Sequence, residues 1–226
     1  MKLSRRDLIA GSATAVALAA PAVLTGTSAL AAGAEWYNGS KTDNGVNFRA
    51  TNFSVVDARW KRQMVVYNSP EKPGTVVIDT RNHFLYWIWE NNTAMRYGVG
   101  VGKEGFEWYG RARVDRKVLW PRWVPPAEML KRSPHLPKLV KGGSPKNPLG
   151  SRALYLFANR ADTGYRIHGN TSPWSIGKSA SSGCIRMFNE DVIDLYQRCP
   201  IGTEVLVLEH LGGQEQEGVR EAVKDT

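Results

Sequence analysis

Short runs of β-branched and aromatic residues, separated by turn-forming residues, dominate the chain. Such runs predict β-strands, because these side chains fit a pleated, half-buried surface. We expect strands at 63–67, 75–79, 84–89, 95–102, 153–158, 165–168 and 203–208. Residues 80–82 are suited to a turn, so the second and third runs should form a hairpin. Gly98, Gly100 and Gly102 alternate along the fourth run, which allows another segment to approach that backbone closely.

A single clear helix is expected among these strands. Asn189 can cap its N-terminus, and the two acidic residues that follow are favourable near the helix dipole. Val192, Leu195 and Tyr196 fall at helical spacing and should pack on the sheet. The pattern therefore predicts a β-rich, largely antiparallel domain with one short helix.

A Pro-rich stretch at 121–148 interrupts the strands, because regular strands and long helices do not persist through repeated prolines. Loops of this length inside a domain are often functional lids. Ten Lys and Arg lie between residues 111 and 146, against only Asp115 and Glu128. Two interpretations stay open: a solvated surface loop, or a loop that faces substrate, with Trp120 and Trp123 among the charges.

The N-terminal segment 1–31 has the pattern of an export signal. A basic start is followed by a long uncharged run that ends in small residues, and Ser4-Arg5-Arg6-Asp7-Leu8-Ile9 is typical of a twin-arginine signal. A retained membrane anchor is the alternative, although Pro21 and many small residues favour removal. Residues 32–73 are interpreted as a linker with one short strand, 74–209 as the main domain and 210–226 as a polar tail.

Removal of the signal leaves 27 Lys and Arg against 20 Asp and Glu, a net charge of +7. A basic surface suits nucleic acid, an anionic membrane or an acidic polymer. Export argues against nucleic acid, and the chain offers no clean basic amphipathic helix for a membrane surface. No stable membrane span is expected after signal removal. An acidic cell-wall polymer is the remaining partner.

Two residues carry the candidate chemistry, Cys184 and His168. Cys184 follows a glycine on the way into a strand, which can present its sulfur and its own N–H to one cleft. His168 ends an apolar strand, while the other three histidines have no convincing partner. An imidazole raises the thiolate fraction of a thiol whose ordinary pKa is about 8.5, and the thiolate can then attack a carbonyl. A disulfide between Cys184 and Cys199 is the competing interpretation.

Metal chemistry is not expected, because zinc sites need three or four closely spaced ligands. The chain has no CxxC, HxxxH or HExxH pattern. No metal and no cofactor are predicted.

Four segments around these residues form a recognisable pattern. They are Asn147-Pro148-Leu149-Gly150, Ile167-His168-Gly169-Asn170, Pro173-Trp174-Ser175-Ile176-Gly177 and Ser181-Ser182-Gly183-Cys184-Ile185-Arg186-Met187. Together they closely resemble the signature of L,D-transpeptidases with a YkuD-type catalytic domain, over about residues 74–209. The resemblance implies a mainly β fold, a mixed β-sandwich-like domain with one or two short helices and a long Pro-rich lid loop.

The resemblance also implies roles for individual residues. Cys184 would be the nucleophile and His168 its base, oriented by the carbonyl of Gly169. The N–H groups of Gly183 and Cys184, with that of Ser182, would form the oxyanion hole. The residues implied to contact substrate are Arg186, Ser182, Ser181, Trp174 and Asn147.

Finally, the resemblance implies a peptidoglycan transpeptidase of the periplasm or cell envelope. The acyl group would come from a tetrapeptide stem and pass to an amine, either of another stem or of an envelope protein. Two alternatives stay open: hydrolysis or detachment of wall-linked groups, and a catalytically silent wall-binding protein. Ser182 stands where the family often has a second histidine, so altered substrate contacts are expected.

Overall fold

The structure is a computed structural model that describes residues 33–103 and 108–209. The expected export signal and polar tail lie outside these residues. Within the described ranges, no helix is both long and apolar enough to cross a membrane.

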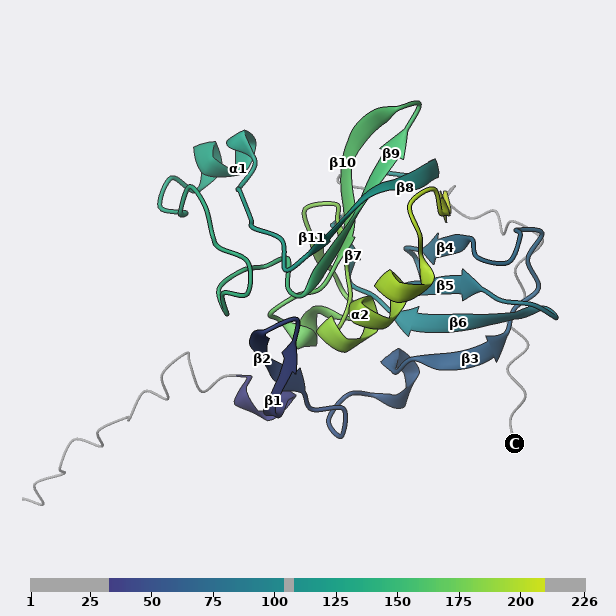
Figure 1. Cartoon of the computed structure of the whole chain (residues 1–226), viewed down its shortest axis with the longest axis horizontal. Helices are drawn as coiled ribbons and strands as arrows, with labels where there is room; N and C mark the ends of the chain where they lie inside the picture. The colour runs from purple at the N-terminus through teal and green to yellow at the C-terminus, as the bar shows by residue number, and fades with distance from the viewer. Residues whose placement is uncertain (1–32, 104–107, 210–226) are drawn as a thin grey trace, which may run out of the picture. The chain divides into compact units, whose positions relative to one another are not determined.

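A nine-stranded mixed sheet organises the domain (Figure 1). Its strands, in spatial order, are β12 (Ile185–Arg186), β10 (Ala161–His168), β9 (Arg152–Ala158), β8 (Gly110–Leu119), β13 (Glu204–Val207), β4 (Val76–Asp79), β5 (Phe84–Ile88), β6 (Thr93–Gly98) and β3 (Gln63–Val66). Most neighbours are antiparallel, but β13 pairs with β4 and β10 with β12 in parallel. Figure 1 shows β8–β10 running steeply across the direction of β4–β6, with α2 near the place where these halves meet. The prediction of a mainly β, mixed fold is confirmed.

Apolar residues from both halves of the sheet form the main core, including Ile78, Leu85 and Leu154. Helix α2 (Asn189–Arg198) covers it with Val192 and Leu195, as expected from their spacing. The helix begins differently from the prediction, because its N-cap is Phe188 and has no side-chain cap.

The expected hairpin is present, since β4 and β5 pair antiparallel across the predicted turn. The close approach expected at the alternating glycines is confirmed at Gly98 and Gly100. A Cβ at Gly98 would lie 2.7 Å from the carbonyl oxygen of Trp60, in the 3-10 helix η2 (Ala58–Trp60). A Cβ at Gly100 would lie 2.6 Å from the carbonyl oxygen of Ser175, in η3 (Pro173–Ser175). These glycines allow both short helices to lie directly on the sheet.

The interpretation of the first described residues as a linker is wrong. After η1 (Ala34–Trp36), β1 (Tyr37–Asp43) and β2 (Val46–Thr51) form an antiparallel hairpin. Tertiary contacts hold it: Glu190 in α2 accepts hydrogen bonds from the N–H and hydroxyl of Thr51, and Arg152 forms a two-pronged ion pair with Asp43. β1 is mostly exposed, which explains why its polar sequence does not have the pattern of a buried strand.

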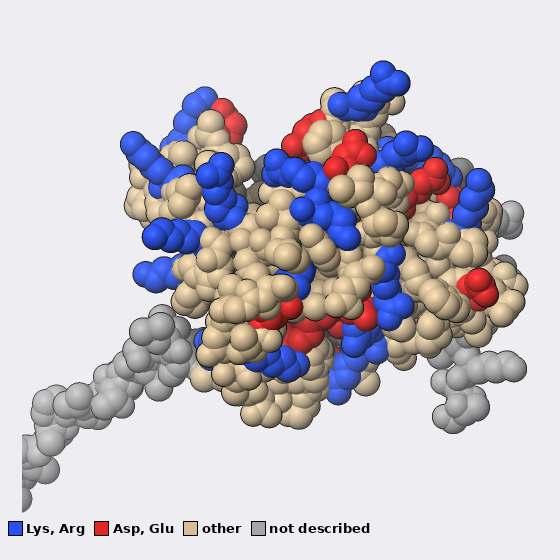
Figure 2. All heavy atoms as spheres, viewed as in Figure 1, with Lys and Arg blue, Asp and Glu red and all other residues tan. Residues whose placement is uncertain are grey.

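The Pro-rich stretch is an excursion from the sheet, as expected, and contains one short helix, α1 (Ala127–Arg132). A bridge between Trp123 and Val140 closes its base. Figure 2 shows Lys and Arg side chains gathered on this excursion. Two short strands outside the main sheet, β7 (Val101–Gly102) and β11 (Ser179–Ser181), pair in parallel next to the segment that carries Cys184.

Candidate active site

The parallel pairing of β10 with β12 brings the two predicted chemical residues onto one face of the sheet. Ile167 pairs with Ile185, and His168 pairs with Arg186. Side chains alternate along a strand, so Cys184, one residue before β12, has the same facing as Arg186 and His168. Both isoleucines point to the opposite face, where they are buried in the core.

His168 is held in one orientation and kept neutral. It is 4% exposed, and its Nδ1 lies 2.5 Å from the carbonyl oxygen of Gly169. A carbonyl can only accept, so Nδ1 carries the proton and Nε2 is left with a free lone pair. Burial lowers the pKa of His168 to about 4, which outweighs the Gly169 hydrogen bond, and the charges of Arg186 and Arg166 act in the same direction as burial. The imidazole is therefore an unprotonated base near neutral pH.

Cys184 is a partly exposed thiol whose Sγ lies 4.0 Å from the carbonyl oxygen of Gly164. Burial raises its pKa, against the opposing influence of the Arg166 backbone and of the Arg166 and Arg186 charges. With a neutral imidazole nearby, the resting site holds a thiol and not a thiolate–imidazolium pair.

The other cysteine has a different environment. Cys199 is a free thiol, 0% exposed, at the end of α2. Burial raises its pKa to about 12, the opposing charge of Lys117 notwithstanding. Its position and its high pKa make it a packing residue with little reactivity.

A tight turn presents the Cys184 backbone. The Ser181 hydroxyl donates to the Cys184 carbonyl oxygen at 2.6 Å and accepts from the Gly183 N–H at 3.1 Å. Gly183 has φ = 113°, a conformation that favours glycine. Ser181 is 4% exposed, so here its side chain shapes the turn. The Gly183 N–H predicted for the oxyanion hole is engaged by Ser181, which leaves the N–H groups of Cys184 and Ser182 as the candidates.

Behind His168, Gly169 is required by close packing. A Cβ there would lie 2.3 Å from Asn189 Oδ1. That oxygen accepts the Ser151 N–H at 3.0 Å, and the Asn189 amide donates to the Asn170 carbonyl at 2.9 Å. Sequence reasoning missed this bracing role of Asn189 because asparagine beside a helical pattern favours a cap.

The remaining predicted residues lie in three different settings. Arg186 is half-buried, and its backbone N–H and C=O pair with Gly100 at 2.8 and 2.9 Å. Ser182 and Trp174 are exposed, Trp174 at 38%. Asn147 is 1% exposed, and its amide donates to the carbonyls of Pro121 and Lys141 at 2.7 and 3.1 Å. The position of Asn147 therefore fits a residue that ties the Pro-rich loop together, and not the substrate contact predicted for it.

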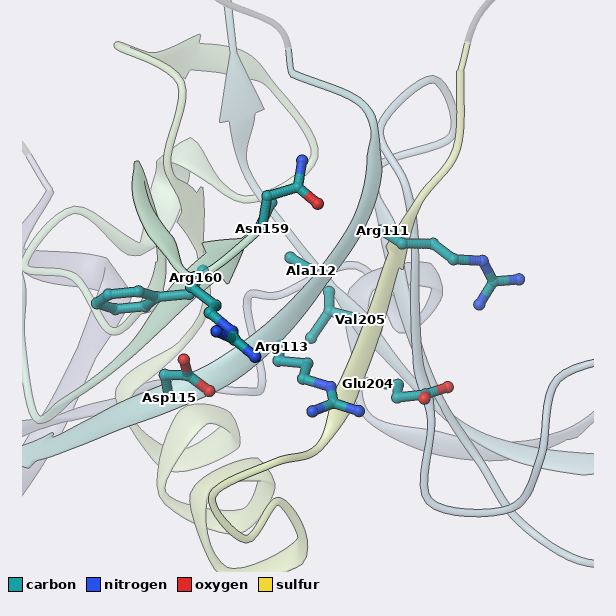
Figure 3. A pocket seen from close by; sticks show the side chains of 10 residues that line it. Arg111, Ala112, Arg113, Asp115, Asn159, Arg160, Glu204 and Val205 are labelled. Carbon is teal, nitrogen blue, oxygen red and sulfur yellow. The ribbon is translucent and has the colours of Figure 1, made fainter.

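A separate hollow of about 350 Å³ lies on β8, β9 and β13 (Figure 3). Its lining is strongly charged and includes Arg111, Arg113, Arg160 and Glu204, but neither Cys184 nor His168. Across the described ranges, no group of His, Cys, Asp and Glu could hold a metal ion.

Comparison with known proteins gives a consistent assignment. The L,D-transpeptidase catalytic domain (YkuD) family model matches residues 73–207. The chain is 32% identical over 155 residues to the probable L,D-transpeptidase ErfK/SrfK of Escherichia coli, covering 65% of this chain and 47% of that protein. It is 35% identical over 134 residues to the putative L,D-transpeptidase YqjB of Bacillus subtilis, covering 58% of this chain and 69% of that protein.

A solved structure from Brucella melitensis, described as a probable carnitine operon oxidoreductase, is 49% identical. The alignment covers 70% of this chain and 99% of that one, with a TM-score of 0.47. The family assignment does not rest on this structure. It rests on the family model, which matches more than half of the chain, and on the two L,D-transpeptidase relatives. The chain thus belongs to the L,D-transpeptidase catalytic domain (YkuD) family.

Proposed function

We propose that this protein is a peptidoglycan L,D-transpeptidase that works by cysteine acyl transfer. It takes an acyl group from a tetrapeptide stem, at the third residue, and passes it to an amine. Family membership supports the reaction class, and the geometry around Cys184 and His168 supports the division of roles.

In the first half of the reaction, Nε2 of neutral His168 takes the proton of the Cys184 thiol. The thiolate adds to the stem carbonyl, and backbone N–H groups at Cys184 and Ser182 stabilise the oxyanion, each by on the order of 3 kcal/mol. The imidazolium then gives its proton to the departing D-alanine amine, and a thioester remains.

In the second half, His168 removes a proton from the acceptor amine as the amine attacks the thioester, and the thiol is regenerated. The acceptor is the side-chain amine of another stem, giving a 3-3 cross-link, or an amine of an envelope protein. Water in place of the amine would make the protein a carboxypeptidase or amidase. The protein works in the periplasm, after export by the twin-arginine-type signal.

The observation that carries the proposal is the parallel register of β10 and β12, which gives Cys184 and His168 the same facing. Beside it, the Gly169 carbonyl holds Nδ1 and leaves Nε2 available. A wall-binding protein without activity would have no use for this arrangement.

The test is intact-mass measurement of the protein from residue 32 onward after incubation with a carbapenem, a strained acyl donor. We expect one adduct on the wild type, none on Cys184→Ala, and slow formation on His168→Ala. Cys199→Ala is the matched control and should form the adduct at the wild-type rate. An adduct that persists in Cys184→Ala, or a wild type that forms none with both thiols free, would contradict the proposal.

A further inference from the structure

Three side chains form a row across the sheet that ends at Cys184. Arg116 on β8 is in register with Tyr155 on β9, and Tyr155 is in register with Arg166 on β10. β10 pairs with β12 in parallel from Ile167 and Ile185 onward, and extending this register back by one residue places Cys184, just before β12, beside Arg166. Residues in register on adjacent strands have the same facing, so all four lie on one face.

The two guanidinium groups flank the same aromatic ring. Cζ of Arg116 lies 3.7 Å and Cζ of Arg166 lies 4.3 Å from the centroid of the Tyr155 ring. Arg166 is further fixed by Asp162, whose two oxygens accept from its two terminal nitrogens at 2.7 and 2.8 Å. Burial raises the pKa of Asp162, but the Gly164 N–H and Arg166 outweigh it and lower the pKa overall. Asp162 is therefore a carboxylate that holds Arg166 in place.

Arg116 is held less tightly than Arg166. Its charge helps to lower the pKa of the nearby Asp162 carboxylate, but both oxygens of Asp162 bind Arg166. Arg116 is exposed, and among the described residues nothing forms a hydrogen bond or ion pair with its side chain beyond the stacking on Tyr155. A guanidinium carries five N–H donors in a planar fork that matches a carboxylate. Stacking on Tyr155 orients this fork before any ligand arrives, which reduces the entropy lost on binding.

The distance from Arg116 to Cys184 suits a peptide lying across the strands. Neighbouring strands are about 4.8 Å apart, so three spacings put the two backbones roughly 14 Å apart. An extended residue covers about 3.5 Å, and the arginine side chain itself covers part of the distance. A peptide whose carbonyl is at Cys184 can therefore present a carboxylate to Arg116 from two to three residues away.

We propose that Arg116, Tyr155 and Arg166 form an anion-binding subsite for a carboxylate of the peptide that reacts at Cys184. This inference rests on the proposed function and adds the direction in which the peptide lies, across β10 and β9 towards β8. The carboxylate belongs either to the acyl donor or to the acceptor, and the two half-reactions distinguish these sources.

The test compares wild type and Arg116→Gln with a tetrapeptide donor in its free-acid form and in a form with its side-chain carboxylates amidated. D-alanine release without an added amine reports the donor half, and dimer formation at varied acceptor concentration reports the acceptor half. With the free-acid peptide we expect KM to rise by roughly 10- to 100-fold, the range for one charge-assisted hydrogen-bond pair. The kcat should stay within about twofold of the wild type.

With the amidated peptide, wild type and Arg116→Gln should have the same KM. If Arg116 had only a structural role, the variant would raise KM for both peptides. Arg116→Lys should restore part of the effect, since it keeps the charge without the fork. Arg113→Gln is the matched control: Arg113 is an exposed arginine of the same strand that lines the separate hollow (Figure 3). It should behave as wild type. Alkylation by iodoacetamide, which has no charge, should be equal in all variants.

An effect on the donor KM or on the acceptor KM supports the subsite and identifies the source of the carboxylate. The subsite alone is overturned if Arg116→Gln leaves both KM values unchanged, or affects free and amidated peptides equally. If the wild type releases no D-alanine, the proposed function fails, and the subsite fails with it.

Discussion

Acidification should destabilise the fold through His168, and the size of the effect follows from its burial. The pKa of His168 is about 4 in the folded protein, against an ordinary value of 6.5. The unfolded chain therefore binds a proton on this side chain at a higher pH than the folded chain does. The contribution of His168 to stability is complete above pH 6.5, falls as the pH drops, and levels off below about pH 4.

The magnitude is set by the difference between the two pKa values. Each unit corresponds to about 1.4 kcal/mol, so a difference of roughly 2.5 units gives a loss of about 3 kcal/mol on complete acidification. A loss of this size is a large fraction of the 5–15 kcal/mol that typically separates folded from unfolded protein.

The assay is urea unfolding of wild type and His168→Gln between pH 7.5 and pH 4. Glutamine does not titrate, so the wild-type free energy of unfolding should fall by about 3 kcal/mol more than that of the variant. The comparison is necessary because Asp191 acts in the opposite direction: burial raises its pKa to about 7, so protonation of Asp191 stabilises the folded state as the pH falls. This contribution is common to both proteins and cancels.

If the free energies of unfolding of wild type and His168→Gln fall equally with pH, the low pKa of His168 is refuted. An NMR titration in which the His168 ring has a pKa of 6 or higher in the folded state would refute it as well. Either result would mean that the imidazole is solvated or paired with an anion, and that it starts the reaction protonated for much of the neutral range.

Two further variants and one alkylation experiment test the support of the site. Ser181→Ala removes two hydrogen bonds from the Cys184 turn, so the free energy of unfolding should fall by about 2 kcal/mol and carbapenem acylation should slow. In Gly169→Ala the new methyl group collides with the packing behind His168, and thermal unfolding should show a loss of about 1–3 kcal/mol with slower acylation. Iodoacetamide should alkylate Cys184 in the folded protein while Cys199 reacts only in denaturant, as peptide mapping would report.

Most strands of the main sheet could be predicted because they are apolar. An exception is β8, whose sequence indicates a basic loop because half of its residues, most of them exposed, are charged. β4 and β5 are buried along their whole length, and their composition indicates this directly. The β1–β2 hairpin could not be predicted in this way, because β1 is mostly exposed. What holds the hairpin is remote in sequence, such as the hydrogen bond from the Tyr37 hydroxyl to the Thr171 carbonyl at 2.7 Å.

Cys184 and His168 could be singled out from the sequence, since a cysteine after a glycine and a strand-end histidine are distinctive, and the pairing of β10 with β12 gives them the same facing. Their catalytic roles stay a prediction. The hydrogen-bond partners around them could not be predicted. Asn189 and Asn147 had plausible local roles as a cap and a substrate contact, but in the structure both amides bind backbone groups of other segments. A buried side-chain amide forms hydrogen bonds with the backbone groups that the tertiary fold places beside it. Spacing along the sequence does not show which groups these are. The Arg116–Tyr155–Arg166 row depends on strand register in the same way.

The central claim is that Cys184 accepts the acyl group of a stem peptide with His168 as base. The most direct test is intact mass of the protein during incubation with a tetrapeptide stem, quenched in acid to preserve the thioester. We expect a mass increase equal to the stem minus D-alanine, located on Cys184 by peptide mapping. The increase should be absent in Cys184→Ala and strongly reduced in His168→Ala. A wild type that never carries this mass, or carries it at a residue other than Cys184, would contradict the account.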